Sequence, residues 1–278
     1  MKKLYFSVII LILPIVFASC FGANENTTET NTDLSVTVLK TGKSDAIIIT
    51  DNGHTMLIDT AESEDSDKIT DYLNDANITT IDYLVITHLD KDHVGGAASV
   101  IETVNVKKVY QSPNSESSEE YRAYLDALTN SGITAEKVTE KVNLTLGDAE
   151  ITLLSPQKVY YENDNEYSVM VSLKYGDTSF LFAADALGER LEEYLADTTD
   201  TYDFLKVPHH GRVDKSTEKF VESVDPQYAV ITSSKNKKPD NEVINILNNH
   251  GVETYLTVEG TVTAVSDGKT IKISQNKK

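Results

Sequence analysis

The chain has 278 residues, of which 40% are hydrophobic, and it carries a formal net charge of −19 at pH 7 and a single cysteine. This length allows a sizeable core, and the acidic balance repels polyanions at long range, so it disfavours stable binding of nucleic acid. One cysteine excludes a disulfide within the chain.

The amino-terminal segment resembles a secretory signal. Two lysines precede an apolar run over residues 4–17, which is too short to span a bilayer comfortably as a mature helix. Small residues then lead to Cys20, a placement that resembles the lipid-modified first residue of a bacterial lipoprotein. We therefore expect a lipoprotein signal peptide over 1–19, lipidation of Cys20, and attachment to the outer face of the bacterial cell membrane. A signal peptide cleaved elsewhere, with an incidental cysteine, is the alternative.

A polar tether is expected over residues 20–33. This stretch is rich in Asn, Thr and Glu, and such a composition cannot bury a core. Removal of residues 1–19 takes away two lysines and no acidic residue, so the formal charge goes from −19 to −21. We expect the mature protein to be an acidic monomer that is held at the membrane through Cys20.

The remaining chain predicts one domain over 34–278. β-Branched and apolar stretches indicate strands, and apolar residues at helical spacing indicate helices. Strands are predicted at 35–39, 46–50, 55–58, 81–86, 106–110, 135–139, 150–154, 168–175, 178–183, 204–207 and 228–232, followed by three closing strands. Helices are predicted at 66–76, 95–103, 119–130, 187–195, 216–224 and 241–249. Runs of strands with helices between them suit two sheets that are covered outside by helices, which is an α/β fold.

The segment Thr87–Gly96 carries the clearest chemical signal. Two imidazoles and two carboxylates fall within six positions, directly after the predicted strand at 81–86. These residues are His88, Asp90, Asp92 and His93. A loop at the carboxyl end of a strand can aim alternate side chains at one point, as binding of divalent cations requires. A solvated polar turn is the alternative, but four of the six histidines of the chain lie in this loop and at 209–210, which favours a metal site.

On these residues the chain resembles the metallo-β-lactamase-fold hydrolases, and most of all the soluble domain of ComEC-type DNA-uptake proteins. The loop of the superfamily reads His-x-His-x-Asp-His, and Asp90 stands here at the second histidine, as in that branch. Further landmarks follow in the order of the family, and they are Asp45, Leu57–Thr60, Phe180–Asp185 and Leu205–Gly211. The resemblance covers 34–274 and implies an αββα sandwich with two mixed β-sheets flanked by helices.

The resemblance also implies a ligand set for two divalent ions. It places one ion on His88 and Asp90. It places the other on Asp92 and His93, with Asp185 bridging both ions. Capping of the following helix is the alternative role of Asp185. The residues expected to be catalytic are Asp92, His93 and Asp185.

Other positions have supporting roles by the same resemblance. Relatives carry a further histidine before the bridging carboxylate, whereas this chain has Asn165 and Ser168 there, the spacing of the ComEC-like branch. Asp59 corresponds to a residue that braces the metal loop, and Asp45 to the acid before the second strand. Oxygen-rich ligands beside imidazole shift the metal preference towards harder cations, so we expect Mn²⁺ or Zn²⁺.

His209 and His210 follow another apolar strand, so at least one of them can point towards the metal loop. Adjacent residues of an extended chain point to opposite sides. We therefore predict His209 as a metal ligand, and His210 as an orienting or substrate-contacting residue. Arg212 and Lys238 belong to the only basic features that we expect near the catalytic loops, and they form either an anion pocket or a solvated loop.

The predicted function is extracytoplasmic hydrolysis by metal-activated water. Bound metals acidify water, and a pair of metals can hold both the attacking and the leaving oxygen of a phosphoryl displacement. We therefore expect a phosphodiester substrate, in a small molecule such as a nucleotide or in a polymer such as nucleic acid or an envelope component. Two alternatives remain, namely a carbon-ester, thioester or lactam hydrolase of the same fold, and a non-catalytic lipoprotein that binds metal or anion.

Overall fold

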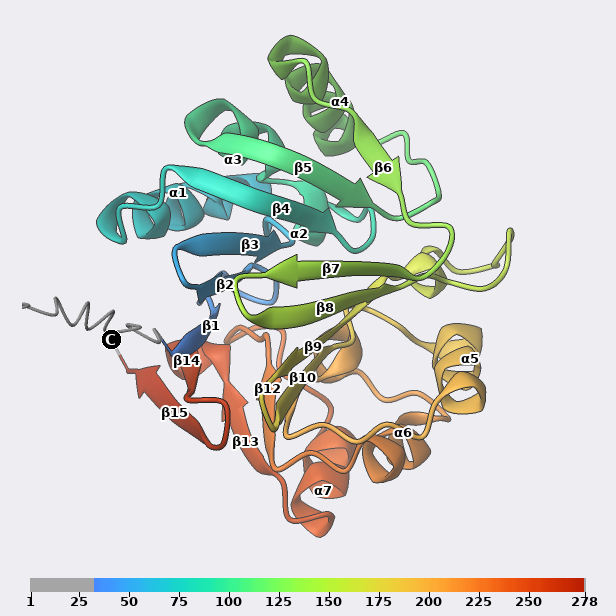
Figure 1. The fold of residues 1–278 in the computed structure, drawn as a ribbon. Helices are drawn as coiled ribbons and strands as arrows, with labels where there is room; N and C mark the ends of the chain where they lie inside the picture. Colours follow the sequence, from blue (N-terminus) through green and yellow to red (C-terminus); the bar gives the residue numbers. More distant parts are fainter. Residues whose placement is uncertain (1–32, 278) are drawn as a thin grey trace, which may run out of the picture. The chain divides into compact units, whose positions relative to one another are not determined.

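The computed structural model describes residues 33–277. The expected signal peptide, Cys20 and nearly all of the tether lie outside the described residues, so these assignments stay predictions. The described residues form two β-sheets that face each other, with helices on the outer faces (Figure 1). This arrangement confirms the predicted α/β sandwich. Within 33–277, no helix has the length and apolar character needed to cross a membrane.

The first sheet has eight strands in the order β15-β14-β1-β2-β3-β4-β5-β6. Their bounds are β1 Leu34–Val38, β2 Ile47–Asp51, β3 His54–Ile58, β4 Thr80–Ile86, β5 Asn105–Gln111, β6 Ala135–Lys137, β14 Thr261–Ser266 and β15 Ile271–Asn276. The hairpin between β2 and β3 turns at Asn52 and Gly53, which both have positive φ (49° and 80°), as the Asn-Gly pair predicts. From β3 to β6 the strands run parallel.

The second sheet has seven strands in the order β13-β12-β11-β10-β9-β8-β7. Their bounds are β7 Val142–Leu146, β8 Ala149–Leu154, β9 Met170–Tyr175, β10 Thr178–Phe182, β11 Phe204–Lys206, β12 Tyr228–Ile231 and β13 Glu253–Leu256. From β10 to β13 the strands run parallel. We did not predict β7, since this short edge strand alternates apolar residues with Asn143 and Thr145 and buries only Leu146 fully.

Three helices cover each sheet (Figure 1). They are α1 Ser66–Asp75, α3 Ala97–Thr103 and α4 Glu119–Ser131 on the first sheet, and α5 Gly188–Asp197, α6 Thr217–Val224 and α7 Asn241–Asn249 on the second. The predicted helix at 95–103 is preceded by a separate short helix, α2 Lys91–Val94, because Gly95 and Gly96 interrupt the sequence. A Cβ atom at Gly96 would collide with the backbone oxygen of Thr60, so this close approach of the metal loop to the end of β3 requires glycine.

The core lies in three layers. Side chains from both sheets, such as Val36, Ile49, Val171 and Phe182, fill the space between the sheets. Two outer clusters join each sheet to its helices. The facing sheet covers one face of each sheet, and helices cover the other. Functional side chains of the parallel strands are therefore expected at the strand ends, where the chain leaves the sheet.

Candidate metal centre

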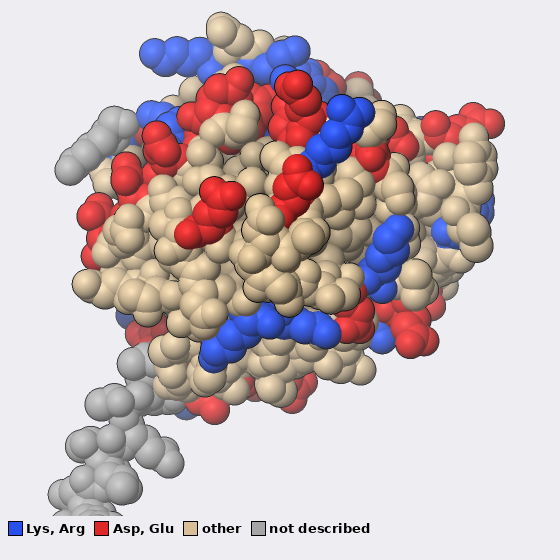
Figure 2. All heavy atoms as spheres, turned by 90° about the horizontal axis from the view of Figure 1, so that it is seen from above, with Lys and Arg blue, Asp and Glu red and all other residues tan. Residues whose placement is uncertain are grey.

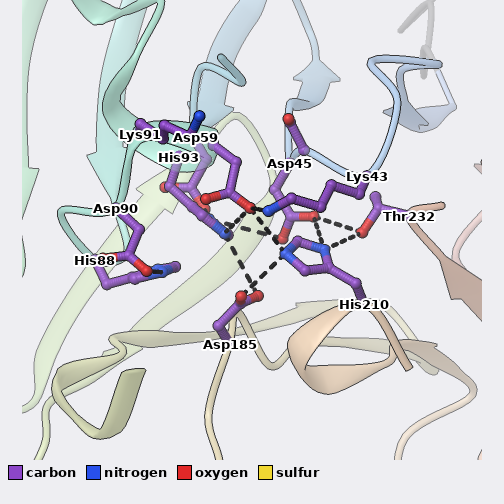
Figure 3. A network of polar contacts seen from close by, with 12 residues as sticks. Lys43, Asp45, Asp59, His88, Asp90, Lys91, His93, Asp185, His210 and Thr232 are labelled. Atoms are coloured by element: carbon purple, nitrogen blue, oxygen red, sulfur yellow. Dashed lines mark hydrogen bonds and ion pairs between the residues drawn. The ribbon is translucent and has the colours of Figure 1, made fainter. Parts of the chain in front are cut away.

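The carboxyl ends of parallel strands from both sheets meet at one edge of the molecule. Each of these strands is followed within a few residues by a polar side chain that points into the same region (Figure 3). These residues are Asp59 after β3, His88 and the rest of its loop after β4, Asp185 after β10, His210 after β11 and Thr232 after β12. Segments that are far apart in the chain therefore build one site.

Four buried side chains form what we call the four-ligand cluster. Asp92, His93, Asp185 and His210 each offer one ligand atom, and these atoms all lie within 4.8 Å of one another. Nε2 of His210 lies 3.0 Å from Oδ2 of Asp185 and 3.2 Å from Oδ2 of Asp92. Nε2 of His93 lies 3.4 Å from Oδ1 of Asp185 (Figure 3).

Three donor atoms of this cluster lack a hydrogen-bond partner in the described part of the chain. Nε2 of His93, Nε2 of His210 and Oδ1 of Asp185 are buried and accept or donate no hydrogen bond within the described residues. Leaving a buried polar atom unpaired costs about 1–3 kcal/mol. Imidazole and carboxylate atoms that converge in this way are a ligand set for a divalent cation, so the residues fit the metal that the resemblance implies.

The support of His93 comes from Asp59. Oδ2 of Asp59 lies 2.7 Å from Nδ1 of His93, and the same carboxylate accepts hydrogen bonds from the backbone N–H of Thr87 at 2.7 Å and from its hydroxyl at 2.6 Å. With Nδ1 donating to Asp59, Nε2 of His93 keeps its lone pair for the cluster. Asp59 thereby fixes both the ring and the start of the metal loop.

The support of His210 comes from Thr232 and Asp45. The hydroxyl of Thr232 donates to Oδ1 of Asp45 at 2.7 Å, so it accepts from Nδ1 of His210 at 2.9 Å. This chain of hydrogen bonds selects the tautomer in which Nε2 of His210 is free to bind a metal. The other oxygen of Asp45 pairs with the fully buried Lys206, whose Nζ also donates to a backbone oxygen at 3.0 Å.

Asp45, Asp59 and His93 form a second group of converging donor atoms. Both oxygens of each carboxylate are already engaged, by Thr232 and Lys206 at Asp45 and by Thr87 and His93 at Asp59. We therefore interpret this second group as a hydrogen-bonded support rather than as another metal site.

The backbone is strained around this centre. Eight non-glycine residues in the described part of the chain have positive φ, and five of them lie at the site. These are Asp59, Ala61, Ala184, His209 and His210. Each such residue costs on the order of 1–3 kcal/mol, a cost typical of positions held for function.

The left-handed backbone corrects the prediction for the histidine pair. His209 and His210 have φ of 47° and 54° instead of extended values, so the alternation rule does not apply to them. His210 enters the four-ligand cluster, whereas Nε2 of His209 lies 3.5 Å from Nδ2 of Asn165. The extended backbone from which the ligand role of His209 was predicted is therefore absent, and the four-ligand cluster contains His210 in its place.

The other predicted ligands lie beside the cluster. His88 is fully buried, its ring centroid lies 3.8 Å from that of His93, and its Nε2 has no hydrogen-bond partner in the described chain. The side chain of Asp90 is 45% exposed, and its Oδ2 lies 3.8 Å from Nε2 of His88. Among residues 33–277, Oδ1 of Asn165 and Oγ of Ser168 also have no hydrogen-bond partner and are buried. These atoms are outside the four-ligand cluster, so the second ion of the expected pair stays a prediction.

The basic residues at the site differ from those that we predicted. Arg212 pairs with Asp240 at 2.7 Å, and Lys238 is exposed in its loop. Lys43 instead pairs with Asp92, and Lys206 lies 3.7 Å from Asp185. Our expectation that the only basic features near the site would be at 212 and 235–238 is therefore wrong.

Charge interactions set the protonation of the metal-free cluster. Burial would raise the pKa of Asp185, but His210 and His93 outweigh it and hold that pKa well below its ordinary value. Burial likewise opposes the charged forms of His93 and His210, yet the nearby carboxylates, chiefly Asp185, raise both pKa values. Without metal, protons on the imidazoles neutralise the carboxylates, and a bound metal would replace these protons.

This protonation predicts how stability depends on pH. The raised pKa values of His93 and His210 contribute stability below the ordinary value of 6.5, and this contribution is lost as pH rises through the raised values. The lowered pKa values of Asp92 and Asp185 contribute above the ordinary value of 3.8 and are lost in acid. We expect the Tm of protein treated with a chelator to fall as pH rises above about 6.5, and Mn²⁺ to stabilise more at higher pH. A metal-free Tm that rises over this range in thermal unfolding would contradict the assignment.

Comparison with known proteins agrees with this geometry. The family model of the Metallo-beta-lactamase superfamily matches residues 39–233. ComE operon protein 3 of Bacillus subtilis (strain 168) is 26% identical over 190 residues, which are 67% of this chain and 24% of that protein. The chain thus spans about a quarter of the length of this curated relative.

Solved structures share the fold. The metallo-beta-lactamase fold protein YhfI of Bacillus subtilis superposes with a TM-score of 0.58 at 10% identity, over 87% of this chain and all of that chain (100%). A diphosphatase of the PhnP family superposes with a TM-score of 0.52 at 14% identity, over 84% of this chain and 98% of that chain. With a family model that covers most of the folded region and ligands at the ends of the matching strands, the chain belongs to the metallo-beta-lactamase superfamily.

Proposed function

We propose that this metal-dependent hydrolase cleaves phosphodiesters. The assignment as a metal-dependent hydrolase rests on the family and on the four-ligand cluster. The observation that carries the proposal is the convergence of buried, unpartnered imidazole and carboxylate atoms beside two lysines, since such a site suits a metal together with an anionic substrate.

The residues of the chain have separable roles in such a reaction. Asp92, His93, Asp185 and His210 would hold the metal, which when bound lowers the pKa of a water molecule towards neutrality. Asp59 and Thr232 orient the two imidazoles. Asp92 stays ionised, because His210, His93 and Lys43 outweigh the effect of burial and keep its pKa far below the ordinary value, so it would serve as a charged ligand and not as a proton acceptor.

Charge argues for a small or envelope-bound phosphodiester over long nucleic acid. The chain carries −19 in total, and on the face shown in Figure 2 acidic and basic side chains are interspersed instead of forming a continuous basic surface. A polyanion is repelled by such a protein when screening is weak. The diphosphatase that shares the fold also acts on a phosphate compound, which supports the choice of a phosphorus substrate.

We further propose that the protein acts outside the cytoplasm, on the outer face of the bacterial membrane and anchored through Cys20. The segment before the tether supports this location by its two lysines, apolar run and single cysteine. Mass spectrometry of the membrane-associated protein would test it. An unmodified Cys20 would contradict the anchor.

A panel of substrates tests the proposed reaction. With Mn²⁺ or Zn²⁺ added, the protein is expected to hydrolyse bis-p-nitrophenyl phosphate and to cut long DNA poorly at low salt. Efficient DNA cleavage at low salt would instead indicate that nucleic acid is the substrate. Turnover of only thioesters or lactams would move the protein to carbon-ester chemistry, and metal binding without any turnover would favour a binding role.

A further inference from the structure

Two lysine ammonium groups reach the carboxylates of the metal centre, and they are held differently. Lys206 is fully buried, and its Nζ donates to a backbone oxygen at 3.0 Å, pairs with Asp45 and lies 3.7 Å from Asp185. The side chain of Lys43 is 31% exposed, and within residues 33–277 its ammonium pairs with Asp92 alone. Lys206 is therefore a fixed part of the site, whereas Lys43 can move once that one contact is broken.

The ammonium of Lys43 lies on an oxygen that a metal ion would need. It pairs with Oδ2 of Asp92, and the same oxygen lies 3.2 Å from Nε2 of His210 and 4.0 Å from Nε2 of His93. A lysine ammonium and a divalent cation compete for such a carboxylate oxygen, and only the metal can also use the imidazole lone pairs. Binding of metal at the four-ligand cluster would therefore displace the ammonium of Lys43.

Hydrogen bonds anchor the backbone of the loop that carries Lys43. The N–H of Asp45 donates to the backbone oxygen of Asp92 at 3.1 Å, and the hydroxyl of Thr41 donates to the backbone oxygen of Ser44 at 2.8 Å. These bonds hold both sides of the loop that carries Lys43, beside the metal centre (Figure 3). Because the side chain is a flexible four-carbon stem, a displaced ammonium remains within reach of an anion bound at the centre.

We propose that Lys43 binds the anionic group of the substrate. Without metal it neutralises Asp92, and with metal bound it contacts a phosphoryl oxygen that does not take part in bond cleavage. This inference rests on the proposed function and assigns a recognition residue to it. In an acidic protein, a cation beside the metal would strengthen binding of a phosphodiester, and the predicted candidate Arg212 has its guanidinium on Asp240. A neutral carbon ester would gain little from such a group.

Binding measurements on the full chain test this role without requiring turnover. The probes are Mn²⁺ alone, and then inorganic phosphate added to Mn²⁺-loaded protein, both followed by calorimetry. Lys43→Met removes the charge, and Lys43→Arg keeps it. Lys91→Met is the matched control, because Lys91 belongs to the metal loop but is 63% exposed and lies 3.6 Å from Glu62.

Lys43→Met is expected to bind Mn²⁺ several times more tightly, since no ammonium has to be displaced, and to bind phosphate about tenfold more weakly than the unmodified protein. Lys43→Arg should keep phosphate affinity within about threefold, and Lys91→Met should change neither affinity. Together these results would separate a substrate-binding role from a general effect of charge near the site.

Unchanged phosphate affinity in Lys43→Met at full Mn²⁺ occupancy would overturn the proposal. Weaker binding of Mn²⁺ by this variant would also overturn it, because Lys43 would then serve only to position Asp92. If Lys43→Met fails to fold by circular dichroism, Lys43→Gln replaces it and is judged by the same outcomes. Failure of the proposed function would appear separately, as absence of phosphodiester hydrolysis by the unmodified protein.

Discussion

His210→Ala is expected to lose metal from the four-ligand cluster, whereas His209→Ala keeps it. Nε2 of His210 lies within 3.2 Å of both Asp185 and Asp92, and Nε2 of His209 lies beside Asn165 instead. Removing a supporting residue of a metal site typically costs 10–100-fold in affinity, so removing a direct ligand should raise the Kd for Mn²⁺ by about 100-fold or more.

The adjacent pair makes this a controlled comparison. Both variants remove one imidazole from the same 3₁₀ turn, Pro208–Gly211, so a general disturbance of that turn would affect both. Metal content after dialysis and Mn²⁺ affinity by calorimetry give the result. Loss of metal from His209→Ala with retention in His210→Ala would reverse the assignment.

Asp92→Asn is expected to lower kcat/KM for bis-p-nitrophenyl phosphate by about 100-fold or more. The substitution preserves size but removes the negative charge of Asp92, which His210, His93 and Lys43 keep ionised. It removes a charged oxygen ligand from the four-ligand cluster. Steady-state kinetics at saturating Mn²⁺ would show the loss mainly in kcat.

Asp71→Asn is the matched control, because Asp71 is exposed on α1 and belongs to no cluster of the described site. It changes the net charge by the same amount, so activity close to that of the unmodified protein is expected. An Asp92→Asn variant that retains full activity while bound to metal would show that Asp92 is not part of the reaction centre.

Local patterns in the sequence predicted most of the fold. The Asn52-Gly53 pair allows the positive φ values of a tight hairpin, and the apolar spacing in 119–130 and 241–249 predicts two helices within a residue or so of their observed bounds. The strand β7 escaped prediction because its signal is short and half polar. Such elements depend on the neighbouring strand, here β8, more than on their own residues.

The metal loop was predictable because its donor residues lie close together in the sequence. The distant residues that support the site could not be predicted in this way. Thr232 and Lys206 lie in or at the end of buried strands, where sequence patterns alone do not show which distant carboxylate they meet. The backbone conformation at His209 was unpredictable for a different reason. Positive φ is uncommon for residues other than glycine, so an extended backbone was the natural expectation, whereas both histidines are left-handed in the turn at 208–211.

Anomalous X-ray diffraction from crystals grown with Mn²⁺ tests the central claim most directly. We predict an anomalous peak about 2.0–2.4 Å from the ligand atoms of Asp92, His93, Asp185 and His210. We also expect the ammonium of Lys43 to have moved away from Asp92. A cluster that remains free of metal at saturating Mn²⁺, with Lys43 still on Asp92, would contradict the account.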